Sequence, residues 1–326
     1  MLVINLENLS LRTCIPVQLL AAMVVIVTAV LFATSPALAV NANLEVNLGY
    51  NDNVAESAAK QGSAFCNYAF DVEQTLYASD NNSISGYANT YYRDHFRLGD
   101  QWQATAGLSA WHRLLNGRLH ATLFADLSRY ADQVNIDDER DFLALGSSWQ
   151  LFFNEKLSTT FALSFEDSRY RHKIEKSTTI ASEQKKHHSQ TVYTTSLSSK
   201  QRNDKLWLLS TTIDYRFNAD ASTQLTISYS DNDSTLGAES YTETGLESHW
   251  QYLLTPAWEL EIWGSHLWQE YNYAQERNWL AATRINWQLR SALAVYVQLE
   301  KQWHTAPRNA DCYTEMVSQC GFIWSY

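Results

Sequence analysis

The sequence of 326 residues predicts an all-β chain whose strands close into a transmembrane, antiparallel, up-and-down β-barrel of about fourteen strands. Apolar and polar residues alternate with a period of two over long stretches, for example 119–127, 157–165 and 279–289, and this period indicates strands rather than helices. The connections alternate between tight turns and longer polar stretches, an asymmetry typical of membrane barrels. Aromatic residues gather near strand ends, where such barrels carry their interfacial girdles.

The N-terminal end is typical of a secretory signal peptide. Arg12 precedes the uncharged apolar run 19–33, and small residues occupy the Ala37 and Ala39 positions of a cleavage site. The alternative is a membrane anchor, but a spanning helix needs about 20 apolar residues. We therefore expect cleavage after Ala39, so that residues 1–39 are removed and residues 40–326 form one barrel domain. Alternation begins by Leu44, which argues against the large plug of an energy-coupled uptake transporter.

The strands can be placed in order from the alternation and the turns between them. Tight turns are expected at 79–82, 116–117, 154–156, 218–221, 255–257 and 290–291. The expected strands are 43–50, 64–77, 83–95, 101–115, 118–130, 142–153, 156–170, 205–217, 222–230, 241–254, 258–269, 278–289, 292–303 and 315–326. The polar stretch 171–204 is expected to be a long external loop, with an extra hairpin or an inserted flap as alternatives. Twelve or sixteen wall strands are the other counts considered.

The C-terminal segment alternates aromatic residues and stops on one of them. Gln319, Gly321, Phe322, Trp324 and Tyr326 form the pattern polar-x-Gly-aromatic-x-aromatic-x-aromatic. This segment resembles the C-terminal assembly signal of Gram-negative outer-membrane β-barrel proteins. The resemblance implies a location in the outer membrane, with the membrane lipid and the assembly machinery as partners. It also implies that this last strand pairs with residues 44–50 and closes the barrel.

The apolar set of side chains is expected to face lipid. The aromatic residues near tight turns are Trp149, Phe153, Tyr215, Phe217, Trp250, Tyr252, Trp287, Trp324 and Tyr326; those near long connections are Trp102, Tyr170, Trp207, Tyr229 and Trp279. Two belts of aromatic residues with smaller aliphatic residues between them match the girdles of a membrane barrel. A soluble β-sandwich or a secreted β-barrel is the alternative.

The opposite set of side chains is polar and rich in acids. By alternation, the inward acids are Glu45, Asp71, Glu73, Asp126, Glu166, Asp214, Glu243, Glu247, Glu259, Glu261 and Glu300, and the inward bases are Arg93, Arg113, Arg216 and Arg284. The best candidates for lumen-lining groups are Asp126, Glu166, Glu247, Glu259, Glu261, Arg284 and Glu300. Glu259 and Glu261 lie two apart on one strand and predict a local negative site, which Arg284 on the next strand could neutralise. An acidic, wet lumen favours cations; the alternative is a salt-bridge network that fills a narrow barrel.

No catalytic, metal or cofactor motif is found. The neighbours Ser265 and His266 point to opposite faces of a strand, and there is no phosphate loop or zinc motif. The acidic stretch 135–140 is interpreted as a solvated loop rather than a calcium site. The mature cysteines Cys66, Cys312 and Cys320 do not suggest a metal site; they are taken by default as small apolar residues, and Cys66 with Cys312 would be the pair if one disulfide forms.

The charge and the fold together narrow the function. A net charge of −11 argues against nucleic acid, and against anionic lipid headgroups, as main partners. We expect a non-enzymatic channel that passes small hydrophilic solutes, with a preference for cations. The first alternative is a barrel that assists surface assembly or export of a partner protein, because Gly49-Tyr50-Asn51-Asp52-Asn53-Val54 resembles the barrel portion of surface-lipoprotein assembly modifiers. Those proteins carry a helical repeat domain ahead of the barrel, which this chain lacks. The second alternative is a structural or adhesive barrel that acts through 171–204.

Overall fold

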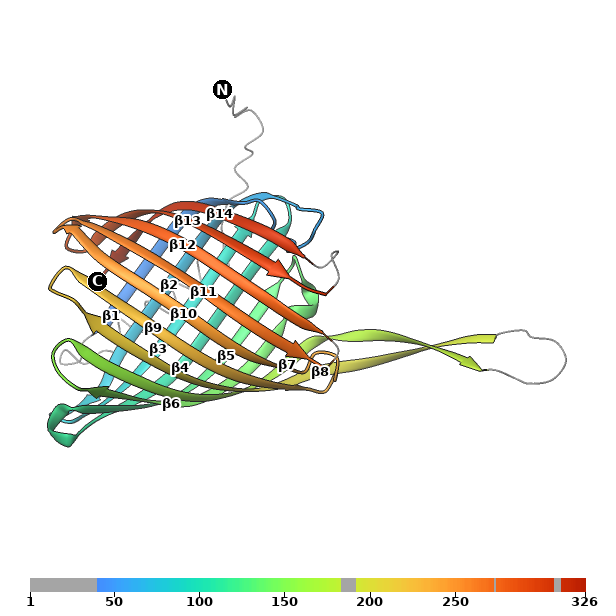
Figure 1. The fold of residues 1–326 in the computed structure, drawn as a ribbon, viewed down its shortest axis with the longest axis horizontal. Helices are drawn as coiled ribbons and strands as arrows, with labels where there is room; N and C mark the ends of the chain where they lie inside the picture. The colour runs from blue at the N-terminus through green and yellow to red at the C-terminus, as the bar shows by residue number, and fades with distance from the viewer. Residues whose placement is uncertain (1–39, 183–191, 273, 308–311) are drawn as a thin grey trace, which may run out of the picture. The chain divides into compact units, whose positions relative to one another are not determined.

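The computed structural model describes residues 40–182, 192–272, 274–307 and 312–326, which form one closed antiparallel barrel (Figure 1). The predicted signal peptide, 1–39, lies outside the described residues. The strands are β1 (Val40–Asn51), β2 (Ser63–Ala78), β3 (Asn82–His95), β4 (Gly99–Leu114), β5 (Leu119–Asp132), β6 (Arg140–Phe152), β7 (Leu157–Ser182), β8 (Val192–Arg216), β9 (Ala221–Ser234), β10 (Tyr241–Thr255), β11 (Trp258–Tyr271), β12 (Gln275–Arg290), β13 (Leu293–Thr305) and β14 (Tyr313–Ser325). The predicted fold class and strand number are confirmed.

Each strand pairs with its neighbours in sequence, and β14 pairs with β1 to close the ring. The closing register places Leu44 opposite Trp324 and Tyr50 opposite Ser318. Beyond the last register pair, Tyr326 and Ala42 exchange two backbone hydrogen bonds of 2.8 and 3.0 Å. Along the strands that the structure describes, every wall edge is therefore paired, which is what a sheet in hydrocarbon requires.

One set of alternate side chains makes the outer face of the barrel apolar. Leu127 and Leu123 are 67% and 61% exposed, and Val297 is 57% exposed. In water so many exposed aliphatic side chains would be anomalous, but lipid covers them at no cost. Trp207, Trp250, Trp279 and Trp324 also lie on this face. The outer face thus has the composition of a lipid-facing wall.

The other set faces the lumen, as contacts that skip a strand demonstrate. The Tyr87 hydroxyl on β3 donates to Asp126 on β5, across Gly107 on β4. On the opposite part of the wall, Tyr296 on β13 donates to Glu45 on β1, and the strand between them is β14. Side chains two strands apart converge only on the concave side of a curved sheet, so these residues point inward.

The two ends of the barrel differ in their connections. Short turns join β2 to β3, β4 to β5, β6 to β7, β8 to β9, β10 to β11 and β12 to β13. The other end carries longer connections, including residues 52–62, 133–139 and 235–240. In outer-membrane barrels the short turns are periplasmic and the long loops are external, and we name the ends accordingly.

The stretch 171–204, expected to be a loop, is largely strand. β7 and β8 continue past the rest of the wall, with register pairs from Lys173 opposite Gln201 to Ser182 opposite Val192. A register shift between Arg169 and Lys173 separates this arm from the wall (Figure 1, right). The segment therefore forms an extra hairpin made by the two wall strands themselves, and the wall keeps fourteen strands.

One sequence interpretation is corrected, and the alternative that the cysteines left open is decided. Tyr170 does not belong to the outer aromatic belt: it is opposite Arg140 in register, it is 6% exposed, and it faces the lumen. The pairing of Cys66 with Cys312 is not formed. All three cysteines of the described barrel are thiols, and the Cys312 Sγ bonds to the backbone of Ala306 at 3.3 and 3.4 Å. Within the described residues, no helix has the length and apolar character needed to span a membrane.

Candidate functional site

The lumen-facing side of the wall is the candidate site, since it gathers most of the acidic side chains of the described strands. The cross-strand register places all the acids and arginines predicted to be inward on this face. Among the described residues the structure adds the acids Asp132, Asp204, Glu276 and Glu315 and the bases Arg140 and Arg202. The carboxylates therefore outnumber the arginines along the described lumen wall.

Glu259 and Glu261 on β11 form a local cluster near the periplasmic end. The Asn286 side-chain amide on β12 donates to both carboxylates, at 3.0 Å to Glu259 and 2.5 Å to Glu261. Gln251 on β10 donates to Glu259, and the His249 Nε2 lies 3.2 Å from the second oxygen of Glu261. Neutral donors hold both carboxylates in place, and among the described residues bonded to them, His249 is the one that can neutralise charge when it is protonated.

Arg284 does not neutralise this cluster. It is opposite Glu261 in register, but its Nη2 is 4.0 Å from Glu45 on β1. Its Nε donates to the Gln298 side chain at 2.8 Å, and its guanidinium lies 4.2 Å from the centre of the Tyr296 ring. The Tyr296 ring, the Gln298 side chain and the Glu45 carboxylate hold the planar guanidinium away from β11. The Glu259 and Glu261 carboxylates therefore face the lumen without an arginine partner in this position.

The remaining predicted acids are spread around the wall. Asp126 accepts from Tyr87, Glu166 accepts from the Ser168 hydroxyl at 2.5 Å, and Glu300 accepts from Gln298 at 3.5 Å. Glu247 lies opposite Ser265 on the lumen face of β10. Asp126 and Glu166 lie on β5 and β7, whereas Glu247 and Glu300 lie on β10 and β13, so they do not form one compact cluster.

The predicted assembly residues lie on both faces of β14. Gln319 is opposite Gly49 and Gln298, and Gly321 is opposite Asn47 and Tyr296, which places both on the lumen side. Trp324 and Tyr326 face outward and are 51% and 78% exposed. The aromatic half of the signal is thus on the lipid side at the periplasmic end.

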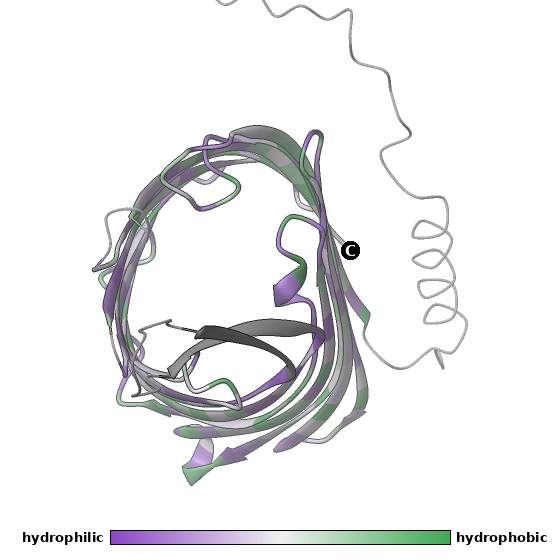
Figure 2. Cartoon of the chain, turned by 90° about the vertical axis from the view of Figure 1, so that its right-hand side faces the viewer, coloured by the Kyte–Doolittle hydropathy of each residue, from purple (hydrophilic) through white to green (hydrophobic). Residues whose placement is uncertain are grey.

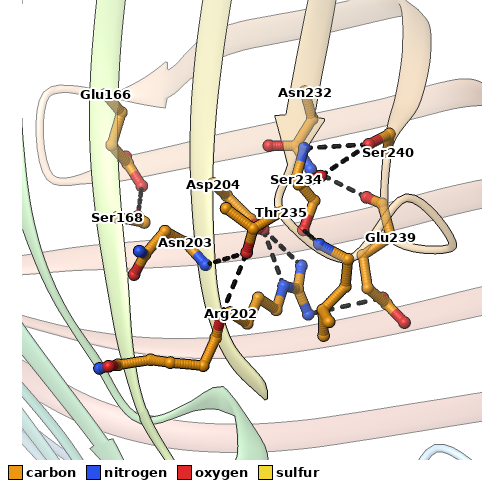
Figure 3. Close-up of polar contacts among 12 residues, drawn as sticks. Glu166, Ser168, Arg202, Asn203, Asp204, Asn232, Ser234, Thr235, Glu239 and Ser240 are labelled. Atoms are coloured by element: carbon orange, nitrogen blue, oxygen red, sulfur yellow. Dashed lines mark hydrogen bonds and ion pairs between the residues drawn. The ribbon is translucent and has the colours of Figure 1, made fainter. Parts of the chain in front are cut away.

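A second polar cluster, which the sequence did not predict, surrounds Arg202 at the external end (Figure 3). Its guanidinium bonds to Asp204 at 2.6 and 2.9 Å and lies 3.5 Å from Glu239 in the β9–β10 connection. The Tyr170 ring is 4.2 Å from the same guanidinium. Asp204 is 5% exposed, so this ion pair is largely shielded from water.

The same cluster fixes the β9–β10 connection. The Asn232 side chain donates to the Glu239 carbonyl at 3.0 Å, and the Ser234 amide donates to the Ser240 hydroxyl at 2.9 Å (Figure 3). The Leu236 amide donates to the Ser234 hydroxyl at 3.2 Å, and the Leu236 side chain is 2% exposed. This external loop is therefore bonded to the lumen wall of β8 and β9.

The β5–β6 connection, residues 133–139, folds into the ring of strands (Figure 2). Asp132 anchors it by accepting from the amides of Val134 and Asn135 at 2.7 and 3.0 Å. The connection includes a short 3-10 turn, η3 (Ile136–Asp138), and the Asn135 side chain donates to Asp138 at 2.6 Å. The acidic stretch expected to be a solvated loop is thus partly enclosed.

Asp138 is the ionisable group most affected by this enclosure. Burial raises the pKa of its carboxyl above the usual 3.8, and the charges of Asp132 and Glu56 raise it further. Arg140 and Arg202 act in the opposite direction. These neighbours come from β5, β6, β8 and the β1–β2 connection, so Asp138 lies where several parts of the wall face one another across the external mouth.

The residues missed by sequence reasoning share one property: they lie at the external ends of strands. Arg140, Arg202, Asp204 and Glu276 fall in stretches that are polar on both faces. Beyond the lipid the outer face needs no apolar side chains, and the alternation that marks a strand disappears. These residues can be assigned to the lumen face only by extending each strand beyond its apolar part and continuing the same alternation of inward and outward side chains.

The described residues include no group of three His, Cys, Asp or Glu side chains arranged to hold a metal ion. A cavity of about 330 Å³ opens at the periplasmic end between β6 and β10, lined by Asp214, Arg216, Gln224, His249 and Gln251 among others. These side chains are polar, which is the composition expected of a water-filled lumen.

Comparison with solved structures shows where else this fold occurs. The outer membrane channel DcaP of Acinetobacter baumannii superimposes with a TM-score of 0.54 at 9% identity, over 90% of this chain and 99% of that chain. OmpT of Vibrio cholerae gives 0.50 at 11% identity over 90% and 99%. The anion-selective porin from Comamonas acidovorans gives 0.50 at 8% identity over 89% and 99%.

Comparison of the sequence itself adds nothing to this result. No family model matches the chain, and no curated protein matches it either. At these identities the likeness shows the fold alone, which is that of outer-membrane β-barrels. Together with the apolar outer face, this fold supports the predicted location in an outer membrane.

Proposed function

We propose that the protein is a passive outer-membrane channel for small hydrophilic solutes, with a preference for cations. The single observation that carries the proposal is the excess of carboxylates over arginines on the lumen-facing wall. A ring of like charge in a water-filled pore attracts counter-ions and repels co-ions.

Glu259 and Glu261 are the groups on which the preference depends most. Neutral amides fix both carboxylates toward the lumen, and the nearest predicted arginine, Arg284, is directed to Glu45 instead. Their negative charge is therefore not cancelled by an arginine partner within the barrel wall. Screening in salt reduces its range to roughly 10 Å at 0.1 M, which is still comparable with the dimensions of a pore.

The test is the ion selectivity of single channels of the refolded protein in planar bilayers. The variant Glu259→Gln/Glu261→Gln removes the charges and keeps the size of the side chains. Its matched control, Asp231→Asn/Asp233→Asn, removes two charges from β9 residues that alternate with the lumen-facing Ser230, Asn232 and Ser234 and point outward. We expect the lumen variant to lower the cation-to-anion permeability ratio by about twofold, and the control to leave it unchanged.

The outcomes separate the alternatives. Conductance steps whose selectivity falls only in the lumen variant would support the proposal. A folded barrel that gives no steps would contradict the channel, and equal effects in both variants would contradict the role of Glu259 and Glu261.

One observation favours a second candidate, a barrel that assists or attaches to a partner. β7 and β8 extend as a paired arm to Ser182 and Val192, farther than a membrane wall requires. Deletion of residues 173–200, closed by a short turn, tests it. If the protein is a channel without such a role, the deletion variant keeps its conductance and co-purifies with the same envelope proteins as the natural chain. If the barrel acts through this arm, the deletion variant no longer co-purifies with a specific partner.

The C-terminal strand is proposed to be the segment that the assembly machinery recognises. Trp324 and Tyr326 are exposed on the lipid side at the periplasmic end, where an incoming barrel is accessible from the periplasm. Replacing both by serine is expected to lower the amount of barrel in the outer membrane in cells, with less effect on refolding of the purified chain in detergent. Equal losses in both assays would indicate a folding role only.

A further inference from the structure

The outer wall of β11, β12 and β13 carries a basic aromatic patch near its external end. We define this patch by Trp268, His266, Trp279, Trp303, Arg277 and Lys301. His266, Trp279 and Trp303 are opposite one another in register across the three strands, and Trp268 is opposite Arg277. All of these side chains alternate with lumen-facing neighbours such as Asn278, Gln302 and His304, so they face the lipid.

His266 is enclosed by two indole rings of the patch, stacked on one and tilted against the other. The His266 ring lies 3.4 Å from the centre of Trp279, nearly parallel at 16°, and 3.7 Å from the centre of Trp268. His266 is 7% exposed, and its Nε2 has no hydrogen-bond partner. Buried polar atoms are normally hydrogen-bonded, so this nitrogen is an exception within the patch.

The two cations of the patch are directed to the external interface. Lys301 lies between Ala281 and Met316 in register, among apolar neighbours, and its ammonium is 5.0 Å from the centre of the Trp303 ring, one step nearer the outside. A lysine in lipid bends its stem in this way to bring its charge to the headgroups. Arg277, on the adjacent strand, is exposed at the same end.

The charges on the rest of the outer rim are arranged differently. Arg129 is 4.0 Å from Asp141, and Arg171 is 2.7 Å from the same carboxylate. Lys205 lines an external cavity of about 520 Å³ that also holds Asp167 and Asp233. Glu270, the acid on the outer face of β11, accepts a hydrogen bond from Gln275 at 3.2 Å. Arg129 also lies 5.4 Å from the centre of the Trp102 ring, so a neighbouring indole alone does not distinguish the patch. Among the described outward cations, Arg277 and Lys301 combine neighbouring indole rings with the absence of an ion pair to an acid, whereas Arg129 shares Asp141.

We propose that the basic aromatic patch binds the phosphorylated headgroup of a lipid in the external leaflet of the membrane. The arginine and the lysine would bond to phosphate oxygens, for which the guanidinium fork is well suited. The indole rings would lie at the level of the headgroups and pack against the adjoining chains. Because the whole chain has a net charge of −11, it repels an anionic leaflet in general, and attraction depends on this local site. The proposal does not rest on the channel function.

The test is titration of the folded barrel in neutral detergent with lipid A, a lipid that carries two phosphates, followed by native mass spectrometry. We expect the variant Arg277→Gln/Lys301→Gln to bind about tenfold more weakly than the natural chain, because two charge-assisted bonds are removed. The matched control Arg129→Gln/Lys205→Gln also removes two outward cations and is expected to bind as the natural chain does. The conservative variant Arg277→Lys/Lys301→Arg is expected to retain the affinity.

Several outcomes would overturn the proposal. These are equal binding by the two glutamine variants, equal binding of lipid A after its phosphates are removed, or loss of binding in millimolar inorganic phosphate, which would indicate a free-phosphate site. The change of electrophoretic mobility on heating shows whether each variant is folded, and binding is compared only for folded barrels.

Discussion

Single side chains stabilise this barrel across its strands rather than along them. The side chains of Tyr87 and Tyr296 each cross the lumen face of the neighbouring strand. Each hydroxyl then donates to a carboxylate two strands away, Tyr87 to Asp126 and Tyr296 to Glu45. In the first case the strand between contributes Gly107, where the Tyr87 ring occupies the space that a Cβ would need. Aromatic rings laid over glycines fill the inner wall without narrowing the lumen at those points.

The pH response of the external mouth is predicted to depend on Asp138. Because burial raises the pKa of its carboxyl in the folded loop, the folded loop binds a proton more readily than the released loop does. The enclosed conformation of residues 133–139 is therefore stabilised as pH falls through this raised pKa toward the usual 3.8, and it is less stable above that range. Amide hydrogen exchange in the loop is expected to slow as pH decreases, after correction for the intrinsic rate.

The matching variant is Asp138→Asn, which keeps the shape of the side chain and does not titrate. It is expected to remove the pH dependence of exchange at residues 133–139 and to leave exchange in the wall strands as it was. If the variant shows the same pH dependence as the natural chain, another group controls the loop.

Arg202 is predicted to hold the β9–β10 connection. The change Arg202→Gln leaves the shielded carboxylate of Asp204 without its cation, and breaking such a pair costs about 3 kcal/mol. Local opening of the loop would then be roughly a hundredfold more frequent, and exchange of the Leu236 amide measures it. The control Arg129→Gln removes an outer cation that is 47% exposed, and it is expected to change this rate little.

At the level of elements, the seam between β14 and β1 depends on Gly321. A Cβ at this position would collide with the Val46 carbonyl oxygen and would lie 2.9 Å from the Asn47 Cα, and both are backbone atoms of β1. The change Gly321→Val is therefore expected to hinder closure of the barrel, because backbone cannot move aside as a flexible side chain can.

The measurement for this prediction is the fraction of refolded protein that resists unfolding by detergent at room temperature, seen as a shift on electrophoresis. We expect Gly321→Val to lower that fraction severalfold. Gly237→Ala is the matched control, because a Cβ at Gly237 meets no atom within 4 Å. A Gly321→Val barrel that closes as well as this control would show that the seam tolerates a side chain.

The elements could be predicted from the sequence as far as lipid covers them. Within the membrane the outer face must be apolar and the lumen face polar, so the alternation predicts strands such as β9 and β12. This condition no longer holds at the external ends, so the alternation predicts that β7 ends near residue 170 and that β8 begins near residue 205. Tyr170 is an aromatic residue at the expected end of a strand, and this position predicts the lipid face. No alternation continues beyond it that would indicate the lumen face instead.

At the level of the whole molecule, the sequence predicts on which face of the barrel the charged residues lie. It does not predict which side chains pair with one another. Alternation alone is enough to place Glu259 and Glu261 on the lumen face. It does not indicate that Arg284 reaches Glu45 instead, because that contact joins β12 to β1 across the closed ring. Such contacts follow from closure and curvature, which no local pattern contains.

The proposed cation channel is tested most sharply by the zero-current potential of the natural barrel in a planar bilayer between unequal concentrations of potassium chloride. Such a channel should give discrete conductance steps and a potential whose sign shows that potassium crosses more readily than chloride, because carboxylates predominate on the described lumen wall. Folded barrels that insert without any conductance, or a potential of the opposite sign, would contradict it.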